Sequence, residues 1–294
     1  MSIDFKKLKS GFRLPVYGLG TWEMGGRFES DQTNDETYIQ AIKNAIEKGV
    51  THIDTAEAYG AGHTEELIAK AIVGYDRSKL FITSKVSSNN QRYDDLIRSC
   101  EASLKRLKTD YLDLYLLHRF PDSGTDIKDT MRAMDHLISN GKIRNIGVSN
   151  FTVNRLKAAQ ACTSNKIVCN QVHYSLDCRE IVDKGILEYC QQNDVFIVAW
   201  GPLSKGAMDK AEILQDMAKK YKKTPYQIAL NWVISQDNVV TIPKTTSIEH
   251  LEENLGSLGW ELDKADMQDL TNNFPGQKLV SDRVALNYEA SVEA

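Results

Sequence analysis

The chain has 294 residues and a formal net charge of −4; 41% of the residues are hydrophobic and 26% are charged. Apolar side chains are therefore available for a sizeable core, which excludes a mainly disordered chain. No basic run indicates a nucleic-acid partner, and no apolar stretch approaches the ~20 residues of a membrane span. The first residues do not resemble a secretory signal, and the 5 cysteines form no CxxC pair, so we expect reduced thiols and a cytoplasmic protein.

Strand-like and helix-like segments alternate along the chain. We expect a small hairpin over residues 5–14 and then eight strand–helix units counted from Tyr17. After the first unit, the predicted strands cover residues 51–54, 80–85, 111–117, 143–148, 167–172, 195–200 and 239–242. The predicted helices cover residues 35–48, 64–73, 96–107, 130–139, 152–162, 181–192, 211–221, 224–235, 247–258 and 264–272.

This alternation favours a parallel sheet in an α/β protein. Eight units in 294 residues favour a closed (β/α)8 TIM barrel over an open sheet with a second domain. No Pro/Gly/Ser-rich linker divides the chain, so we predict one domain over residues 1–294, with the hairpin at its N-terminus and extra helices at its C-terminus. No coiled-coil heptads indicate assembly, and we expect a monomer.

Polar side chains end several of the otherwise apolar predicted strands. Asp54, Lys85 and His118 end the second, third and fourth strands, and Tyr59 follows Asp54 by five residues. In a parallel barrel, the carboxyl ends of the strands form the active-site face. The same face should carry the ends of the later strands, at Ser149, Asn150, Gln171, Trp200 and Lys244.

The first four of these side chains suit general acid catalysis on a carbonyl group. Tyr59 would donate the proton, and a nearby Lys85 ammonium would lower the phenol pKa from its usual value near ~10. Asp54 would keep Lys85 protonated, and His118 would donate a hydrogen bond to the carbonyl oxygen. The structural alternative for Tyr59 is a loop aromatic that packs on the barrel rim.

Six segments resemble motifs of the aldo-keto reductases, in the same order. They are GLGTW (18–22), IDTAEAYG (53–60), ITSK (82–85), YLLH (115–118), GVSNF (147–151) and IPKT (242–245). The resemblance implies an oxidoreductase that reduces carbonyl compounds to alcohols with NADPH, with Tyr59 as the acid of the tetrad Asp54, Tyr59, Lys85 and His118.

The resemblance also implies a nicotinamide cofactor that lies across the barrel mouth. Trp200 would stack on the nicotinamide, and Gly201 and Leu203 would line the pyrophosphate. The implied cofactor contacts are Gly20, Thr21, Trp22, Asp54, Ser149, Asn150, Gln171, Trp200, Gly201, Leu203, Lys244, Thr245, Thr246, His250, Glu253 and Asn254. Ser149, Asn150 and Gln171 would hold the carboxamide, and Glu253 and Asn254 the adenine.

Residues 244–254 are similar to the family's site for the 2′-phosphate of NADPH. A lysine, hydroxyls and a helix N-terminus suit a phosphate. His250 stands where the family usually has an arginine, which would bind phosphate with two hydrogen bonds and stay charged. NADPH is therefore expected because of Lys244, and NADH is the alternative.

The predicted substrate contacts are Trp22, Tyr59, His118 and Arg119. The segment after His118 and the C-terminal tail are both short, which favours an open pocket for small aldehydes or dicarbonyls, similar to bacterial methylglyoxal-reducing members of the family. Arg119 either attracts a substrate carboxylate or forms an outward salt bridge.

The sequence fits three other functional classes less well. A Rossmann dehydrogenase needs GxGxxG, and Glu23 stands where the third glycine is required. The histidines show no HxH or HExxH spacing, so no metal site is expected. A cofactor-binding regulatory or partner subunit with little turnover remains the alternative to an enzyme.

Overall fold

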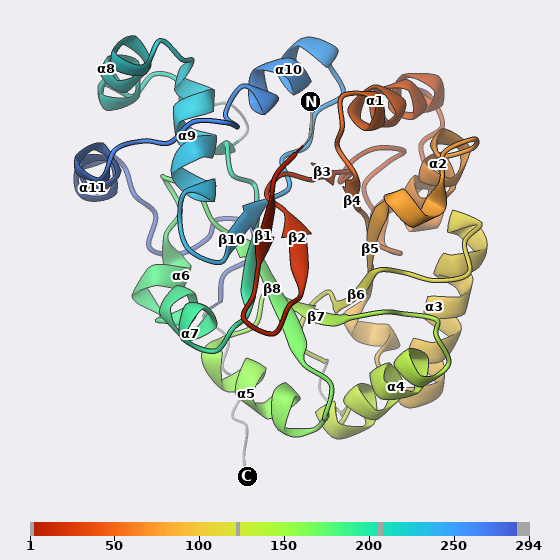
Figure 1. Ribbon diagram of the computed structural model, residues 1–294. Helices are drawn as coiled ribbons and strands as arrows, with labels where there is room; N and C mark the ends of the chain where they lie inside the picture. The colour runs from red at the N-terminus through yellow and green to blue at the C-terminus, as the bar shows by residue number, and fades with distance from the viewer. Residues whose placement is uncertain (1–2, 122–123, 205–207, 287–294) are drawn as a thin grey trace.

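Eight short parallel strands form the centre of the computed structural model, which describes residues 3–121, 124–204 and 208–286. The strands neighbour one another in chain order: β3 (Leu19–Gly20), β4 (His52–Asp54), β5 (Phe81–Val86), β6 (Leu114–Leu117), β7 (Ile146–Ser149), β8 (Ile167–His173), β9 (Phe196–Trp200) and β10 (Val239–Thr241). The last strand returns to the first through a parallel bridge between Tyr17 and Thr241, and Gly18 N donates to Thr241 O at 2.9 Å. The sheet is therefore closed, and the predicted (β/α)8 barrel is confirmed (Figure 1).

Helices surround this barrel (Figure 1). They are α1 (Asp35–Glu47), α2 (His63–Ala71), α3 (Tyr93–Leu107), α4 (Ile127–Ser139), α5 (Val153–Ala161), α6 (Glu180–Asp183), α7 (Ile186–Gln192), α8 (Glu212–Tyr221), α9 (Pro225–Ile234), α10 (Ile248–Leu255) and α11 (Lys264–Asn273). Several start where the sequence predicts: Thr224 and Gln227 form a capping box before α9, and Ser247 caps α10. Within the described residues, no helix is long and apolar enough to cross a membrane.

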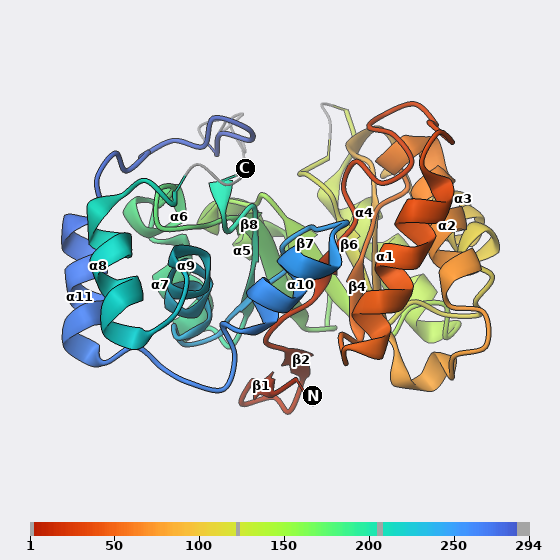
Figure 2. The same ribbon diagram turned by 90° about the horizontal axis from the view of Figure 1, so that it is seen from above.

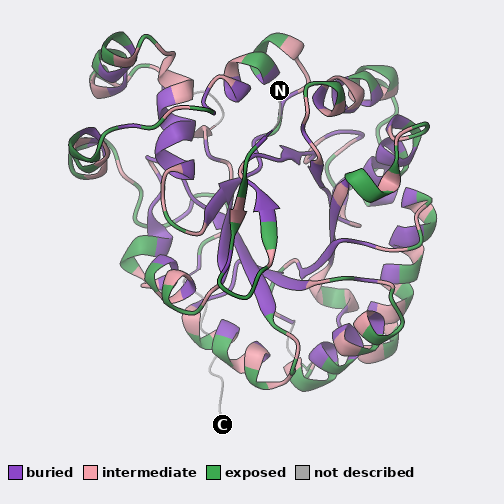
Figure 3. Ribbon diagram, in the orientation of Figure 1, coloured by how far each residue is buried: buried purple, intermediate pink, exposed green. Residues whose placement is uncertain are grey.

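The core has two parts. Outside the sheet, apolar side chains of the strands pack against the helices; inside it, a smaller cluster fills the barrel. The strands are accordingly buried on both faces (Figure 3). The hairpin of β1 (Phe5–Lys7) and β2 (Arg13–Pro15) contributes Leu8 and Leu14 to the inner cluster and covers one end of the barrel (Figure 2). The predicted N-terminal hairpin is thus confirmed, and the opposite end is the barrel mouth.

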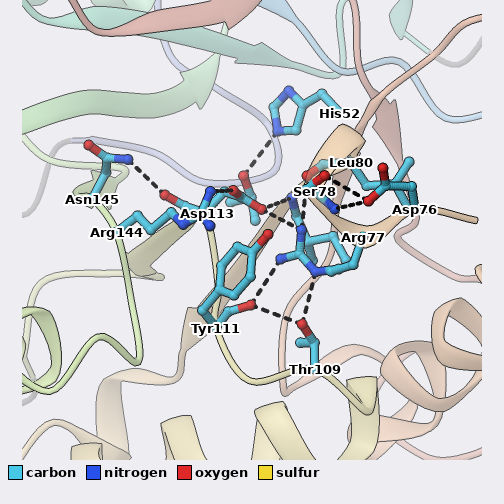
Figure 4. Close-up of polar contacts among 12 residues, drawn as sticks. His52, Asp76, Arg77, Ser78, Leu80, Thr109, Tyr111, Asp113, Arg144 and Asn145 are labelled. Carbon is cyan, nitrogen blue, oxygen red and sulfur yellow. Dashed lines mark hydrogen bonds and ion pairs between the residues drawn. The ribbon is translucent and has the colours of Figure 1, made fainter.

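An ion-pair network, here called the barrel floor, lies at the amino ends of the strands (Figure 4). It consists of Arg77, Thr109, Tyr111, Asp113 and Arg144. Asp113 contacts Arg77 Nη1 at 2.8 Å and Arg144 Nη1 at 3.4 Å. Both guanidinium groups also lie on the Tyr111 ring, at 4.2 and 3.7 Å from its centre. These contacts hold together the turns that precede β5, β6 and β7.

Three of the predicted boundaries are wrong in informative ways. The single helix expected over 181–192 is two helices, because Gly185 adopts a left-handed φ of 65° between α6 and α7. The strand expected over 111–117 begins only at Leu114, since Leu112 makes an isolated bridge instead. Lys244 does not end the eighth strand: β10 ends at Thr241, so Lys244 lies in the following loop.

Candidate active site

A buried ion pair at the barrel mouth joins β4 to β5. Lys85 Nζ donates to Asp54 Oδ1 at 2.6 Å, to the Thr55 carbonyl at 2.7 Å and to Tyr59 Oη at 3.2 Å. Lys85 is fully buried and Tyr59 is 8% exposed. Asp54 pairs with Thr83 in the sheet, so Lys85 lies two residues further along the neighbouring strand, on the same face. The structure therefore brings together three of the four residues predicted for catalysis.

The loop after β4 fixes the position of Tyr59. Gly60 has a φ of 56°, and its N–H donates to the Arg27 carbonyl at 2.8 Å. A Cβ at Gly60 would lie 2.4 Å from the carbonyl oxygen of Gly25. A side chain at this position would therefore push the Tyr59 loop away from the segment after β3, which explains why the turn beside Tyr59 requires glycine.

The protonation states of Tyr59 and Lys85 follow from their burial and from the charges beside them. Burial raises the pKa of Tyr59, and the Lys85 ammonium only partly opposes this effect. The expected lowering of the Tyr59 pKa is therefore wrong in its net direction, because the sequence does not reveal how deeply the phenol is buried. Burial also disfavours a charged Lys85, but the charges and hydrogen bonds of Asp54 and Tyr59 together outweigh burial, and the pKa of Lys85 is raised. At neutral pH the pair is a protonated phenol beside an ammonium.

His118 follows β6 and faces the same tyrosine. Its ring centre lies 5.7 Å from that of Tyr59, in an edge-on arrangement of 71°. Burial, with smaller effects of Lys85 and Arg119, lowers the pKa of His118 to about 3. The imidazole is therefore neutral at working pH, and it can donate one N–H hydrogen bond but does not carry an acidic proton.

The wall opposite Lys85 is built by residues at the ends of β7 and β8. Gln171 Nε2 donates to Asp54 Oδ2 at 2.7 Å, so the carboxylate is bound through both oxygens. Ser149 Oγ donates to the Gln171 carbonyl at 2.8 Å and accepts from Asn150 Nδ2 at 2.9 Å. Three residues predicted to hold a carboxamide thus lie together, beside the Asp54–Lys85 pair.

Trp200 extends this wall at the end of β9. Its Nε1 donates to Asn150 Oδ1 at 3.3 Å. His173 covers one face of the indole, with ring centres 4.4 Å apart and planes within 8°. No motif in the sequence marks His173; its only signal is its place two residues after Gln171, on the same side of the strand.

The remaining predicted contacts lie around this centre. The Trp22 ring lies 4.8 Å from that of Tyr59, and Thr21 Oγ1 donates to the Asp54 carbonyl at 2.8 Å. A Cβ at Gly20 would lie 2.6 Å from the Ile242 carbonyl, so this glycine allows the barrel to close. Arg119 is exposed beside His118.

The segment predicted to bind the 2′-phosphate leads into α10. Ser247 Oγ caps the helix by accepting from His250 N at 3.2 Å, and it also donates to Glu249 Oε2 at 2.5 Å. Lys244 and His250 are exposed. Of the other predicted contacts, Thr245 and Asn254 are buried, and Gly201, Leu203, Thr246 and Glu253 are half-buried. Glu249 brings a negative charge to the helix start, which the sequence analysis overlooked.

Known proteins match this chain over most of its length. The aldo/keto reductase family matches residues 17–273. The methylglyoxal reductase YeaE of Escherichia coli (strain K12) is 38% identical over 272 residues, covering 90% of this chain and 93% of that protein. The thermostable aldo-keto reductase Tm1743, solved with the inhibitor epalrestat, superposes with a TM-score of 0.89 at 44% identity, over 92% of this chain and 99% of that one.

An aldo/keto reductase from Klebsiella pneumoniae, solved with NADP and acetate, superposes with a TM-score of 0.83 at 33% identity. The match covers 94% of this chain and 97% of that chain. By sequence, by fold and by the extent of these matches, the chain belongs to the aldo/keto reductase family of oxidoreductases.

Proposed function

We propose that this enzyme reduces small aldehydes and dicarbonyls to alcohols with NADPH, and that Tyr59 is the general acid. The observation that carries the proposal is the 3.2 Å contact from Lys85 Nζ to Tyr59 Oη. Since Lys85 uses its other donors on Asp54 and Thr55, the phenol oxygen accepts from the ammonium while its own proton remains to be donated. Such an arrangement suits proton transfer to a carbonyl oxygen.

Each residue of the tetrad then has one role. Tyr59, whose pKa burial raises, stays protonated until the carbonyl oxygen gains negative charge. Lys85 stabilises the phenolate that is left, and Asp54 holds the ammonium in place. His118, neutral because its pKa is lowered to about 3, donates its N–H to the same oxygen and orients the carbonyl.

The residues at the mouth fit a nicotinamide cofactor, which supplies the hydride when bound. Trp200 offers the indole face that His173 does not cover, and Ser149, Asn150 and Gln171 offer amide and hydroxyl groups for a carboxamide. The relative from Klebsiella pneumoniae, bound to NADP, supports the phosphorylated form.

NADH remains the alternative to NADPH. Lys244 and the start of α10 favour a 2′-phosphate. Glu249, at the same helix start, opposes it, and the exposed His250 provides less charge than an arginine. We therefore expect a modest preference for NADPH.

The proposed substrates are small carbonyl compounds of the methylglyoxal type. The name of the relative YeaE, a methylglyoxal reductase, supports this class. Trp22, Tyr59 and His118 would form the pocket walls, and Trp22 lies between Tyr59 and the exposed Phe28, at 4.8 and 5.3 Å between ring centres. Arg119 would stand at the pocket edge.

A panel of aldehydes, dicarbonyls and ketones, assayed with NADPH and with NADH, tests the proposal. Wild-type protein should oxidise NADPH steadily with methylglyoxal, and Tyr59→Phe should lower kcat by at least ~100-fold while NADPH binding is retained. Tyr75→Phe, which removes the hydroxyl of a half-buried loop tyrosine that contacts Glu47, is the control. Undiminished turnover by Tyr59→Phe would refute the acid assignment; NADPH binding without turnover of any carbonyl compound would favour a partner subunit instead.

A further inference from the structure

We infer that His173, Gly201 and Arg283 form an anion-binding site beside Trp200 at the barrel mouth. Its ligand is an oxygen of a phosphate or a carboxylate. The inference extends the proposed function, because the anion would belong either to the pyrophosphate of the cofactor or to a carboxylated substrate.

The C-terminal segment is fixed to the barrel on both sides of Arg283. Ser281 N donates to Glu180 Oε2 at 2.9 Å, and Leu286 N donates to Glu180 Oε1 at 2.8 Å. Glu180, at the start of α6, is 1% exposed. One buried carboxylate therefore binds the backbone before and after Arg283. Figure 2 shows this C-terminal segment on the side of the barrel opposite the hairpin.

Hydrogen bonds around Ser281 determine the tautomer of His173. Ser281 Oγ accepts from the backbone N–H groups of Arg283 at 3.2 Å and Val284 at 3.1 Å. Its single proton is therefore available for His173 Nδ1, which lies 2.7 Å away. Burial, with a smaller effect of Arg283, lowers the pKa of His173 to about 4, so the ring is neutral. A neutral ring that accepts at Nδ1 carries its proton on Nε2.

The Nε2–H group of His173 is a buried hydrogen-bond donor that needs an acceptor. His173 is 5% exposed, and within the described part of the chain its Nε2 has no hydrogen-bond partner. Buried N–H donors are normally paired, and a bound acceptor would satisfy this one.

Arg283 approaches the same point. Gly201 has a φ of 64°, and a Cβ there would lie 3.2 Å from His173 Nε2 and 3.3 Å from Arg283 Nη1. Both nitrogen atoms therefore border the side of Gly201 that lacks a side chain, where a charged guanidinium and a neutral N–H converge. An oxygen anion is the ligand that suits two converging donors with one positive charge.

Among the described residues, the carboxylates that interact with the His173 charge are Asp177 and Asp282, and both contact Lys278. Asp282 contacts Lys278 Nζ at 2.8 Å, and Asp177 contacts the same ammonium at 3.9 Å. Asp177 also accepts from the hydroxyl groups of Ser175 and Ser204. Asp282 and Asp177 are thus both paired with Lys278, and Arg283 Nη1 lies beside Gly201.

Four variants test the site: Arg283→Ala, Arg283→Lys, His173→Phe, which keeps an aromatic ring on Trp200, and Lys219→Ala, which removes an exposed positive charge from α8 as the control. NADPH affinity is measured by fluorescence titration. KM is measured for succinic semialdehyde and for butanal, which has the same chain length without the carboxylate.

If the anion is the cofactor's pyrophosphate, Arg283→Ala should raise the Kd for NADPH about tenfold, Arg283→Lys less, and His173→Phe about threefold. If it is a substrate carboxylate, the Kd for NADPH stays unchanged and the KM for succinic semialdehyde rises about tenfold, while that for butanal does not. Either result supports the site. The site is rejected if Arg283→Ala behaves like Lys219→Ala in both assays.

The same variants separate this inference from the proposed function. With NADPH at saturation, Arg283→Ala should still reduce butanal, whereas Tyr59→Phe should be at least ~100-fold slower. A failed reductase assay therefore concerns Tyr59 and leaves the NADPH titration valid. Independently of catalysis, the ¹⁵N resonance of His173 Nε2 should shift when inorganic pyrophosphate is added to wild-type protein and should stay in place in Arg283→Ala. An unshifted resonance, with unchanged NADPH affinity and unchanged KM values, would overturn the inference.

Discussion

The barrel floor and the barrel mouth both bury a carboxylate against a cation. They differ in whether each hydrogen-bond donor has an acceptor among the described residues. In the floor, Arg77 donates to Thr109, Leu80 and Tyr111 and also pairs with Asp113 (Figure 4). Each nitrogen of this guanidinium has an acceptor, and Asp113 is bound by arginine and by a backbone N–H.

The mouth differs from the floor in one donor, the hydroxyl group of Tyr59. Lys85 binds Asp54, Thr55 and Tyr59, and both Asp54 oxygens are occupied. Among the residues that the structure describes, however, none accepts the Tyr59 proton. Buried charge alone therefore does not distinguish the two regions; the mouth differs in having a phenol proton without an acceptor among the described residues.

The largest expected effect comes from removing the mouth's cation. Lys85→Met should lower kcat about 1,000-fold, because the phenolate formed at Tyr59 loses the ammonium that stabilises it. It should also lower the unfolding temperature, since the buried Asp54 loses its cation and keeps Gln171. Steady-state kinetics and thermal unfolding of the same preparation measure both. Normal kcat in a folded variant would contradict the assignment of Lys85.

The matched change in the floor should affect stability alone. Arg77→Met leaves Asp113 with the more exposed and more distant Arg144, and should lower the free energy of unfolding by about 3 kcal/mol. With methylglyoxal, kcat should remain within twofold of wild type. Urea unfolding and kinetics check the two statements, and a large loss of kcat in a fully folded Arg77→Met protein would remove the distinction between floor and mouth.

Acid should destabilise the protein through two histidines whose pKa is lowered in the fold. Burial lowers the pKa of His52, the first residue of β4, to about 4 and that of His118 at the mouth to about 3. The unfolded chain, with histidine pKa values near ~6.5, binds the protons more readily. Stability is therefore present above pH ~6.5 and is lost as the pH falls toward the folded-state values.

His52→Phe sharpens this expectation. Between pH 7 and 4.5 the variant should lose about 2 kcal/mol less stability than wild type, because one proton-linked group is removed. Its kcat at pH 7 should be unchanged. Urea unfolding at both pH values measures the difference; parallel losses in the two proteins would mean that His52 is not protonated on unfolding in this range.

The smallest expected effect concerns the outer edge of the mouth. His250→Arg should tighten NADPH binding about fivefold and leave NADH binding unchanged, since arginine adds a permanent charge and a second hydrogen bond to a phosphate. Glu249→Gln, which removes the opposing charge at the same helix start, should act in the same direction. Equal effects on NADPH and NADH would place the 2′-phosphate elsewhere.

Much of the site's position could be predicted from sequence. Asp54, Lys85 and His118 end apolar strands, and the geometry of parallel barrels brings strand ends to one face, so their meeting with Tyr59 follows from pattern and chain order. The catalytic roles, the NADPH preference, the monomeric state and the cytoplasmic location stay predictions.

What sequence could not reveal depends on contacts between distant segments. The pKa of Tyr59 is raised because of burial, which periodicity does not measure. The bond from Ser281 to His173 spans 108 residues, and the tail that carries Ser281 has no periodic pattern. Arg77 lies outside the predicted strands and Asp113 lies within the run predicted as the strand 111–117, so their pairing had no local signal.

The barrel closes between two of its shortest strands. β3 has 2 residues and β10 has 3, and the join between them depends on the Tyr17–Thr241 bridge and on the absence of a side chain at Gly20. If the junction between β3 and β10 opens on heating before the rest of the barrel unfolds, two strand edges with unpaired N–H and C=O groups become available to other molecules. Thermal inactivation of this protein would then proceed by aggregation through the exposed edges of β3 and β10. Stabilising substitutions at the residues that line this junction should therefore raise its heat resistance.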